Sequence, residues 1–212
     1  MDYDITKYII QAISCRTYDI ALLVHFMYKN KYQVARLKSK IWYMFDGVKW
    51  KLTELGPYYE LSTNVVDVFQ KFIDSETLKL DEGAAETTPR STKLIEERIN
   101  GAEAVITKLK NVNSKELICK ECLYMFYNPD FLANLDTNMS LICFQNGVLN
   151  LTTCSFREAM ADDMLSIHIE CEYLHPSTTK ENADLVYMVE MFQKFRKKII
   201  QQRKTKYSSF PV

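Results

Sequence analysis

The chain has 212 residues, of which 47% are hydrophobic, and its 27 basic and 27 acidic side chains give a formal net charge of +0. A chain of this length can bury one sizeable core or two small ones, and its charge balance excludes a global electrostatic attraction to nucleic acid or membranes. The sequence contains no apolar run of about 18 residues, so it predicts no membrane span.

The amino terminus and the cysteines indicate whether the protein is secreted. The opening residues, MDYDITKYII, lack the basic segment of a secretory signal peptide. Six cysteines in a chain of this length, without such a signal, are typical of reduced thiols. We therefore expect a protein that is not secreted.

Apolar residues recur at helical spacing in several segments of the chain. This period predicts helices over 5–13, 17–29, 58–80, 91–111 and 114–127. The stretch 80–92, LDEGAAETTPRST, has the composition of a loop or flexible linker. A last helix is expected to start near Thr178, which forms a capping box with Glu181. Its narrow apolar seam comprises Leu185, Met188, Phe192, Phe195 and Ile199.

A β-hairpin is predicted within KIWYMFDGVKWKL, after a candidate strand at YQVARLK. Asp46-Gly47 suits a two-residue type I′ turn at its centre. Such a turn places three apolar pairs on one core-facing side, namely Phe45 with Val48, Tyr43 with Trp50, and Ile41 with Leu52. The opposite side, which would face solvent or a partner, carries Trp42, Met44, Lys49 and Lys51.

A second hairpin is predicted within NMSLICFQNGVLNLTT, where Asn146-Gly147 again suits a type I′ turn. This turn pairs Phe144 with Leu149 and Ile142 with Leu151 on one apolar face. The other face holds Leu141, Cys143, Gln145, Val148, Asn150 and Thr152. Small hairpins need cover from other elements. The sequence therefore predicts an α+β fold that is mostly helical, with two small antiparallel β-hairpins or sheets packed against helices.

Catalytic chemistry finds little support in the spacing of the residues. The 5 glycines form neither G-x-x-x-x-G-K-[ST] nor G-x-G-x-x-G, so nucleotide hydrolysis by this chain alone is not expected. Cys119 and Cys122 form a C-x-x-C whose helical setting favours ordinary buried thiols. The alternative is a Cys3His zinc site, whose other ligands would be His168 and Cys171. Asp162-Asp163 is interpreted as a solvated turn or helix start, and we expect no cofactor and no metal.

Positive charge is concentrated in the carboxy-terminal stretch KFRKKIIQQRKTK, which contains no acidic residue. Its basic side chains are Lys194, Arg196, Lys197, Lys198, Arg203, Lys204 and Lys206. Such a stretch can neutralise nucleic-acid phosphates without sequence preference, and the alternative is a solvated helix end. Trp42 beside Lys49 and Lys51 is a candidate for stacking on a single-stranded base. The alternative is that Trp42 packs under a neighbouring helix.

Two stretches together resemble a known domain. YDIALLVHFMYKNKYQVARLKSKIWYMFDGVKW contains a W-Y-x-F pattern with a later Trp, at Trp42, Tyr43, Phe45 and Trp50. A second signature reads L-D-x-N, N-G-V, F-R and a D-D pair, at Leu135, Asp136, Asn138, Asn146, Gly147, Val148, Phe156, Arg157, Asp162 and Asp163. In this order the motifs resemble the pre-helicase domain of poxvirus-type primase–helicases of large DNA viruses, phages and plasmids, over residues 17–170.

The resemblance implies a linker or collar domain between an archaeo-eukaryotic-type primase and a superfamily 3 helicase that assembles as a ring. Residues 1–176 would form this domain, and 177–212 an amphipathic helix whose basic end leads toward a helicase domain. The expected role is non-catalytic support of ring assembly and DNA guidance, within a host cell's cytoplasm or nucleus. Expected partners are DNA, further copies of the protein, and the primase and helicase domains. The alternatives are a stand-alone regulator that binds nucleic acid or protein, and a small metal-dependent enzyme.

Overall fold

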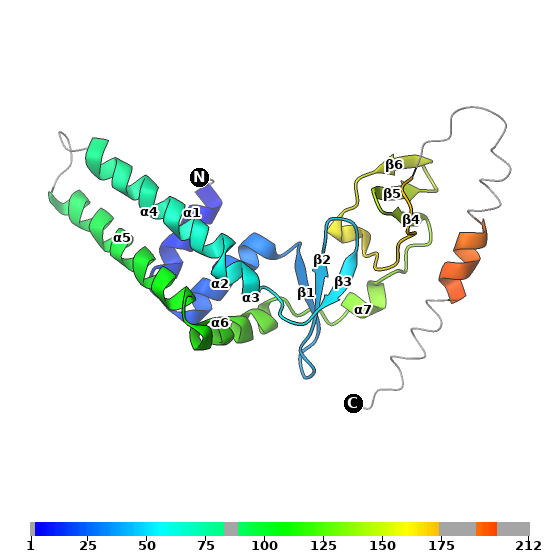
Figure 1. Cartoon of the computed structure of the whole chain (residues 1–212), viewed down its shortest axis with the longest axis horizontal. Helices are drawn as coiled ribbons and strands as arrows, with labels where there is room; N and C mark the ends of the chain where they lie inside the picture. The colour runs from blue at the N-terminus through cyan, green and yellow to red at the C-terminus, as the bar shows by residue number, and fades with distance from the viewer. Residues whose placement is uncertain (1–2, 83–88, 174–189, 199–212) are drawn as a thin grey trace. The chain divides into compact units, whose positions relative to one another are not determined.

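The computed structural model describes residues 3–82, 89–173 and 190–198 (Figure 1). Over these ranges the chain is mostly helical and carries two three-stranded antiparallel sheets, so the predicted α+β fold class is confirmed. The chain divides into two compact units. Unit 1 comprises residues 1–44 and 52–131, and unit 2 comprises residues 45–51 and 132–212. None of the helices in the described ranges combines the length and the apolar character that crossing a membrane requires.

Helices make up most of unit 1. They are α1 (Tyr3–Ala12), α2 (Thr17–Tyr28), α3 (Tyr58–Ser62), α4 (Asn64–Glu82), α5 (Pro89–Leu109) and α6 (Val112–Met125). The predicted helix over 58–80 is divided at Thr63, where ψ of −92° interrupts the helical backbone. The expected linker over 80–92 is shorter than predicted, because α4 continues to Glu82 and Pro89 begins α5. Proline suits the first position of a helix.

The core of unit 1 lies where the apolar faces of these helices meet. Its fully buried side chains include Ile9, Ile20, Leu23, Leu61, Phe69, Leu109 and Ile118. The long helices α4 and α5 lie side by side (Figure 1). Glu76 on α4 is buried and pairs with Lys79 on the same helix and with Arg98 on α5. A buried carboxylate is costly unless it is paired, so these contacts hold the two helices in one alignment.

The first sheet has the order β1-β2-β3, with β1 (Tyr32–Arg36), β2 (Ile41–Phe45) and β3 (Trp50–Thr53). Strands β1 and β2 are antiparallel, and Val34 lies opposite Trp42. The other edge of β1 is bonded to the chain that follows α6. There the Val34 N–H donates to the Phe126 carbonyl at 2.8 Å, and the Asn128 N–H donates to the Val34 carbonyl at 3.0 Å. This edge is therefore covered at its centre.

The first predicted hairpin forms, but its turn closes differently. The Asp46 N–H donates to the Lys49 carbonyl at 3.1 Å, and the rings of Phe45 and Trp50 lie 5.7 Å apart. The turn therefore closes at Asp46 and Lys49, and the predicted pairing of Phe45 with Val48 is wrong. The Asp46 carboxylate accepts from the N–H groups of Val48 (3.0 Å) and Lys49 (2.9 Å). These two hydrogen bonds form an Asx-type turn, which stabilises the chain reversal between Asp46 and Lys49.

The two faces of β2 also differ from the prediction. Trp42, expected to face solvent or a partner, is only 5% exposed. Its ring centroid lies 5.7 Å from that of Phe126 and 6.4 Å from that of Tyr32. Leu52, expected in the core, is 63% exposed. Because Trp42 and Tyr43 are both buried, β2 has packing partners on both faces, and strict alternation does not separate its inside from its outside.

Unit 2 contains the second sheet, in the order β4-β5-β6, with β4 (Leu141–Phe144), β5 (Gly147–Asn150) and β6 (Ser155–Arg157). The short helix α7 (Phe131–Asn134) precedes the sheet, and the 3-10 turn η1 (Ala161–Asp163) follows it. A helix over 190–198 also belongs to this unit. The rest of the predicted carboxy-terminal helix lies outside the described residues, together with its capping box and most of its apolar seam.

The second predicted hairpin forms with a shifted turn. Strands β4 and β5 pair Phe144 with Gly147 and Ile142 with Leu149. The predicted pairing of Phe144 with Leu149 is therefore wrong. The turn residues are Gln145 and Asn146, neither of which has a positive φ, so the turn is not type I′. Gly147 follows the turn and alone takes a positive φ there, of +152°.

The shift leaves the same side chains on each face, because it changes the pairing by two residues. The face that carries Cys143 and Val148 is buried. It contributes Leu141, Cys143 and Val148 to a small core that also includes Leu165. Through Leu165, the chain segment that follows β6 packs against the sheet.

Candidate functional site

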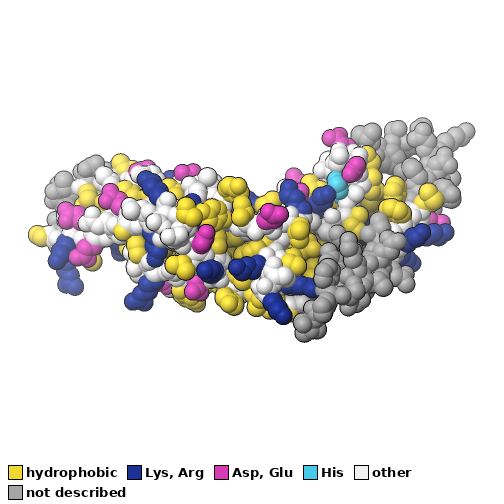
Figure 2. Space-filling model, turned by 60° about the horizontal axis from the view of Figure 1, so that its bottom comes forward, with side chains coloured by type: hydrophobic (Ala, Val, Ile, Leu, Met, Phe, Trp, Pro, Cys, Tyr) yellow, Lys and Arg dark blue, Asp and Glu magenta, His cyan; other side chains and the backbone are white. Residues whose placement is uncertain are grey.

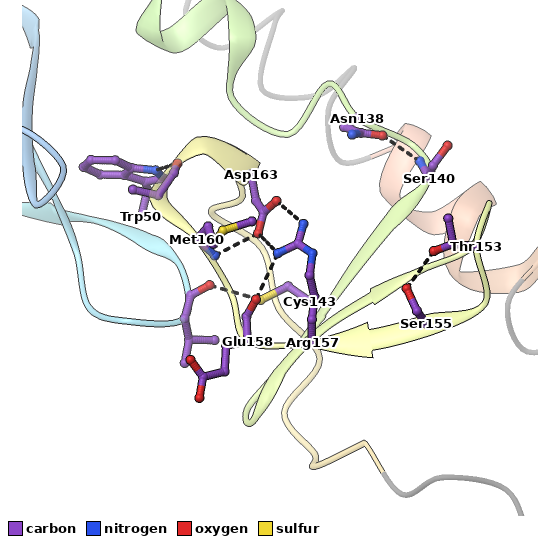
Figure 3. A network of polar contacts seen from close by, with 12 residues as sticks. Trp50, Asn138, Ser140, Cys143, Thr153, Ser155, Arg157, Glu158, Met160 and Asp163 are labelled. Atoms are coloured by element: carbon purple, nitrogen blue, oxygen red, sulfur yellow. Dashed lines mark hydrogen bonds and ion pairs between the residues drawn. The ribbon is translucent and has the colours of Figure 1, made fainter.

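Four motif residues of unit 2 contact the segment 160–167, which follows β6, namely Trp50, Asp136, Arg157 and Asp163. Figure 3 shows three of them, Trp50, Arg157 and Asp163. Trp50 of β3 is 3% exposed and holds this segment at two points. Its backbone N–H donates to the Leu165 carbonyl at 2.7 Å, and its indole Nε1–H donates to the Ala161 carbonyl at 2.8 Å. A buried indole N–H requires such an acceptor. The late Trp of the first signature therefore fixes a segment more than a hundred positions away in the sequence.

An ion pair secures the start of this segment. The Arg157 guanidinium and the Asp163 carboxylate point toward each other in Figure 3 and form a fork, with Nη1–Oδ2 at 2.8 Å and Nη2–Oδ1 at 2.5 Å. Asp163 Oδ2 also accepts from the Met160 N–H at 2.8 Å. Burial would raise the pKa of Asp163, but the hydrogen bonds from Arg157 and Met160 outweigh burial and hold this pKa below its ordinary value.

This pairing corrects the interpretation of Asp163 as solvated, whereas Asp162 is exposed as expected. Asp163 is 9% exposed and belongs to the ion pair, and both residues lie in the turn η1. The sequence analysis missed the role of Arg157 as its partner. The F-R and D-D elements of the second signature were the available signal, because their six-residue separation permits a contact across a tight turn.

Asp136 secures the end of the same segment. It is 1% exposed and has a φ of +59°. Its Oδ1 accepts from the N–H groups of Ser166 (2.7 Å) and Ile167 (3.3 Å), and its Oδ2 accepts from the Ser166 hydroxyl at 2.5 Å. The Asp136 N–H donates in turn to the Met164 carbonyl at 2.7 Å. The carboxylate thus supplies acceptors for backbone groups that the segment itself leaves unbonded.

The two motif asparagines shape the neighbouring loops. Asn138 Oδ1 accepts from the Ser140 N–H at 3.0 Å, which makes an Asx-type turn before β4. The Asn146 amide exchanges two hydrogen bonds with the Tyr173 backbone, at 2.9 and 3.2 Å. Together with the contacts of Trp50, Asp136 and the ion pair, these bonds form what we call the motif frame. Most hydrogen bonds of the motif frame join a side chain to a backbone group of this chain, so the frame holds the loops of unit 2 in position.

The motif frame places a basic surface beside β4. The chain after the frame runs along β4, with the Ile169 N–H donating to the Cys143 carbonyl at 2.8 Å. His168 lies within this stretch, and Lys49 Nζ donates to His168 Nδ1 at 2.8 Å. A shallow depression there is lined by Asp46, Val48, Lys49, Lys51, Gln145 and His168. Two ammonium groups and an imidazole at one depression suit contact with an anion such as a phosphate.

The predicted site residues are only partly brought together. Lys49 and Lys51 share the depression, and the sequence analysis did not include Gln145 and His168 in it. Lys51 also lies 3.4 Å from the Asp46 carboxylate, which reduces its free charge. Trp42 is a buried core residue of unit 1, so its ring offers no face for base stacking. This corrects the stacking prediction and favours the alternative that Trp42 packs inside.

The described part of the basic stretch has two kinds of side chain. Lys194, Lys197 and Lys198 are exposed on the helix over 190–198. Arg196 is 7% exposed, which is contrary to the expected solvated position, and its Nη1 donates to the Leu141 carbonyl. Further basic residues lie outside the described ranges, namely Arg203, Lys204 and Lys206. On the face displayed in Figure 2, Lys and Arg side chains are interspersed with Asp and Glu among the described residues.

The C-x-x-C pair lies on α6 of unit 1. Burial raises the pKa of Cys119 to about 12 and raises that of Cys122 well above its ordinary value. Metal binding and nucleophilic chemistry both require the thiolate, so this setting favours buried thiols. Over the described ranges, His, Cys, Asp and Glu side chains nowhere gather in a group of three or more that could hold a metal ion.

Comparisons with known proteins identify relatives of most of the chain. A family model described as "D5 N terminal like" matches residues 21–201. "Putative helicase L207/L206" of Acanthamoeba polyphaga mimivirus is 31% identical over 156 residues, which cover 73% of this chain and 16% of that protein. The similarly named 121R of Invertebrate iridescent virus 3 is 26% identical over 153 residues, covering 62% of this chain and 16% of its own length. For 184R of Invertebrate iridescent virus 6, the identity is 26% over 180 residues, with coverages of 72% and 18%.

Proposed function

The chain belongs to the D5 N-terminal-like family, and from this premise we propose that it is a non-catalytic module of a DNA-replication primase–helicase. In this proposal the module supports ring assembly and guides DNA next to a superfamily 3 helicase domain. The family match over residues 21–201, which takes in both hairpins and the motif frame, carries the proposal. The chain spans less than a fifth of the length of the relatives it matches, so the helicase activity of a whole protein is itself part of the proposal.

The side chains of the motif frame support a non-catalytic role. Asp136 and Asp163 accept hydrogen bonds from backbone N–H groups, and Asp163 is also paired with Arg157. Carboxylates committed in this way are poorly placed to bind a catalytic metal ion or to transfer protons. We therefore expect the isolated chain neither to hydrolyse ATP nor to synthesise primers. Nucleotide turnover that persists through rigorous purification, measured as phosphate release, would contradict this part of the proposal.

The basic side chains support a weak and non-specific contact with DNA. Exposed ammonium groups at Lys194, Lys197 and Lys198 can meet phosphates without reading bases. Lys49 and Lys51 offer a second contact beside His168. Arg196, although part of the same basic stretch, is excluded from this set because its guanidinium is buried. Binding through a few phosphates is expected to weaken steeply as salt is added.

Ring assembly is tested best in the larger protein to which such a module belongs. Sedimentation velocity would compare a helicase polypeptide that contains residues 1–212 with the same polypeptide without them. The proposal expects the assembled species to dissociate at a higher protein concentration when the module is missing. An unchanged distribution of species in the truncated protein would remove the assembly role and leave DNA contact as the function of the module. The site of action in this proposal is the viral replication site in the cytoplasm or nucleus of a host cell.

A further inference from the structure

The helix over 190–198 docks on β4 through a side chain that is poorly suited to burial. Arg196 is 7% exposed, whereas its neighbours Lys197 and Lys198 are exposed. The Nη1 atom of Arg196 donates to the Leu141 carbonyl. The Nε and Nη2 atoms are buried as well, and within the described residues neither has a hydrogen-bond partner. Arginine remains charged in proteins, and a buried charge with unpaired donors destabilises the contact that buries it.

The surroundings compensate this guanidinium only in part. Burial lowers the pKa of Arg196, while the nearby Asp136 carboxylate acts in the opposite direction. Asp136 already accepts hydrogen bonds from Ser166 and Ile167. Docking of Arg196 on β4 therefore carries a cost in free energy that an apolar side chain of the same length would not carry.

The apolar contacts of the same helix are incomplete. Phe192 and Phe195 border a cavity of about 150 Å³, whose other walls include Ile142, Ile167 and Ile169. Side chains that line unfilled space lack contact atoms on one side and lose dispersion energy there. Phe195 is also 60% exposed. A partly filled apolar contact thus holds the helix on β4 against an unfavourable buried charge.

We propose that the helix over 190–198 is a releasable strap, which leaves β4 when DNA binds and then presents Arg196 beside the exposed lysines. In the docked state, Arg196 adds no charge to the surface that DNA can reach. In the released state its guanidinium can meet a phosphate, as Lys197 and Lys198 can in either state. Because DNA binds the released strap more tightly than the docked strap, it shifts the population toward release.

The identity of residue 196 distinguishes a releasable strap from a permanent one. An apolar side chain would serve a permanent contact with β4 better, because no charge would be desolvated. Arginine weakens docking and also strengthens contact with phosphate, so it favours exchange between the two states. The role of DNA in this inference rests on the proposed DNA contact, whereas release of the strap from β4 does not.

The first experiment follows the strap by nuclear magnetic resonance of the full chain. Methyl-labelled isoleucine reports docking at Ile142, Ile167 and Ile169, because these side chains share a cavity with Phe192. 15N-labelled arginine gives an independent report, because the Arg196 Nε–H is protected from exchange with water while it is buried. Both signals are recorded before and after addition of a short DNA duplex.

On addition of the duplex, the three methyl resonances should move in proportion to the fraction of DNA-bound protein, and exchange of the Arg196 Nε–H should accelerate. Methyl resonances that stay unchanged in the DNA-bound protein, or an Nε–H that stays slow, would overturn the proposal and leave the proposed DNA contact intact. Absence of any DNA binding would instead contradict the proposed DNA contact, and DNA-driven release would fail with it.

Two variants that preserve every charge separate docking from electrostatic attraction. Phe192→Ala removes a half-buried ring from the docking contact, whereas the control Phe195→Ala shortens a side chain that is 60% exposed. The released fraction of the protein limits its apparent affinity for DNA, so Phe192→Ala should bind the duplex at least about threefold more tightly than the parent. Phe195→Ala should stay within about twofold of the parent. Equal affinities of the two variants would contradict the proposal.

A second pair of variants tests release without DNA. Arg196→Met keeps a side chain of similar length and removes the buried charge, and Lys197→Met removes the adjacent exposed charge. Relaxation dispersion of the isoleucine methyl groups measures the population of the released strap. This population should fall in Arg196→Met and stay unchanged in Lys197→Met. A population in Arg196→Met that equals or exceeds that of the parent would show that the guanidinium does not oppose docking, and the proposal would be wrong.

Discussion

Replacing Gly147 with alanine should destabilise unit 2 much more than the same change at Gly47. Gly147 has a φ of +152°, and a Cβ atom built on it would lie 2.4 Å from the Arg157 carbonyl oxygen and 2.8 Å from Cζ of Phe156. Gly47 also has a positive φ, of +100°, but nothing lies within 4 Å of its Cβ position. Both glycines belong to unit 2. The pair therefore separates backbone strain from steric contact.

The expected magnitudes follow from this geometry. A non-glycine residue at positive φ costs about 1–3 kcal/mol, and this is the whole cost expected for Gly47→Ala. In Gly147→Ala the new methyl group must also displace the backbone of β6, which adds about 1–3 kcal/mol. Moving β6 also disturbs Arg157 and its fork with Asp163. With a urea dependence of about 1–3 kcal/mol per molar, Gly147→Ala should lower the unfolding midpoint of unit 2 by about 1 M relative to Gly47→Ala.

Fluorescence can follow unit 2 alone, because the chain has only 2 tryptophans. Trp42 lies in unit 1 and Trp50 in unit 2. In a Trp42→Phe background, the emission of Trp50 therefore reports the unfolding of unit 2 during a urea titration. Equal midpoints for Gly147→Ala and Gly47→Ala would refute the close approach of β6 to Gly147. An unchanged midpoint in Gly147→Ala would also refute the positive φ at this position.

Three further predictions concern the motif frame and the thiols. Arg157→Met should lower the unfolding free energy of unit 2 by about 2–3 kcal/mol, because Asp163 loses charge-assisted hydrogen bonds. The control, Lys51→Met, removes the half-exposed partner of Asp46 and should lower this free energy by less than about 1 kcal/mol. Similar losses in the two variants would contradict this ranking. The pKa of Asp163 is lower in the folded protein than in the unfolded chain, so its contribution is fully present above about pH 4 and is lost as the pH falls through the folded pKa. The gap in urea midpoint between the parent and Asp163→Asn should accordingly narrow from about pH 4 toward pH 2, and a gap that widens in acid would count against the ion pair. Iodoacetamide should modify the exposed Cys154 and leave Cys119 unmodified, because burial raises the pKa of Cys119 to about 12. Mass spectrometry would identify the modified thiols. Rapid alkylation of Cys119 would show that this side chain of α6 is accessible to solvent and would contradict its burial.

The helices and the existence of both hairpins could be predicted from the sequence, because they depend on local periodicity and on turn residues. The hairpin registers could not. Asn146-Gly147 is a strong type I′ signal, yet the structure uses Gln145 and Asn146 as turn residues and places Gly147 after them. Gly147 instead pairs with Phe144 at the start of β5, where the backbone of β6 approaches it too closely for a side chain. The sequence pattern predicted only the two strands β4 and β5, so it could not show that β6 would pair with β5 beside Gly147.

The motif frame shows a similar limit. The resemblance singled out Asp136 and Arg157 as motif residues, but it did not give their partners. Asp136 bonds to Ser166, which is 30 positions away in the sequence, and no periodic pattern connects two such residues. The burial of Arg196 is a tertiary effect of the same kind. Its neighbours in the basic stretch made it appear to be one more solvated charge, whereas contact with β4 removes it from solvent.

The salt dependence of DNA binding tests the central claim most directly. Fluorescence anisotropy with a labelled duplex would compare the parent with a variant carrying glutamate at four basic positions, namely Lys197, Lys198, Arg203 and Lys204. A second variant carries glutamate at two exposed basic residues on α5 of unit 1, namely Arg90 and Lys93. Circular dichroism would establish that the three proteins are equally folded.

If four basic residues each meet one phosphate, the parent should show a slope of about −3.6 in log K against log salt, and its affinity should fall about a hundredfold between roughly 50 and 200 mM salt. The account predicts that the four-site variant loses binding, while the α5 control keeps the affinity and the slope of the parent. Equal affinity of the four-site variant and the parent would show that the basic stretch is only a solvated helix end, and it would contradict a DNA-guiding role for this module.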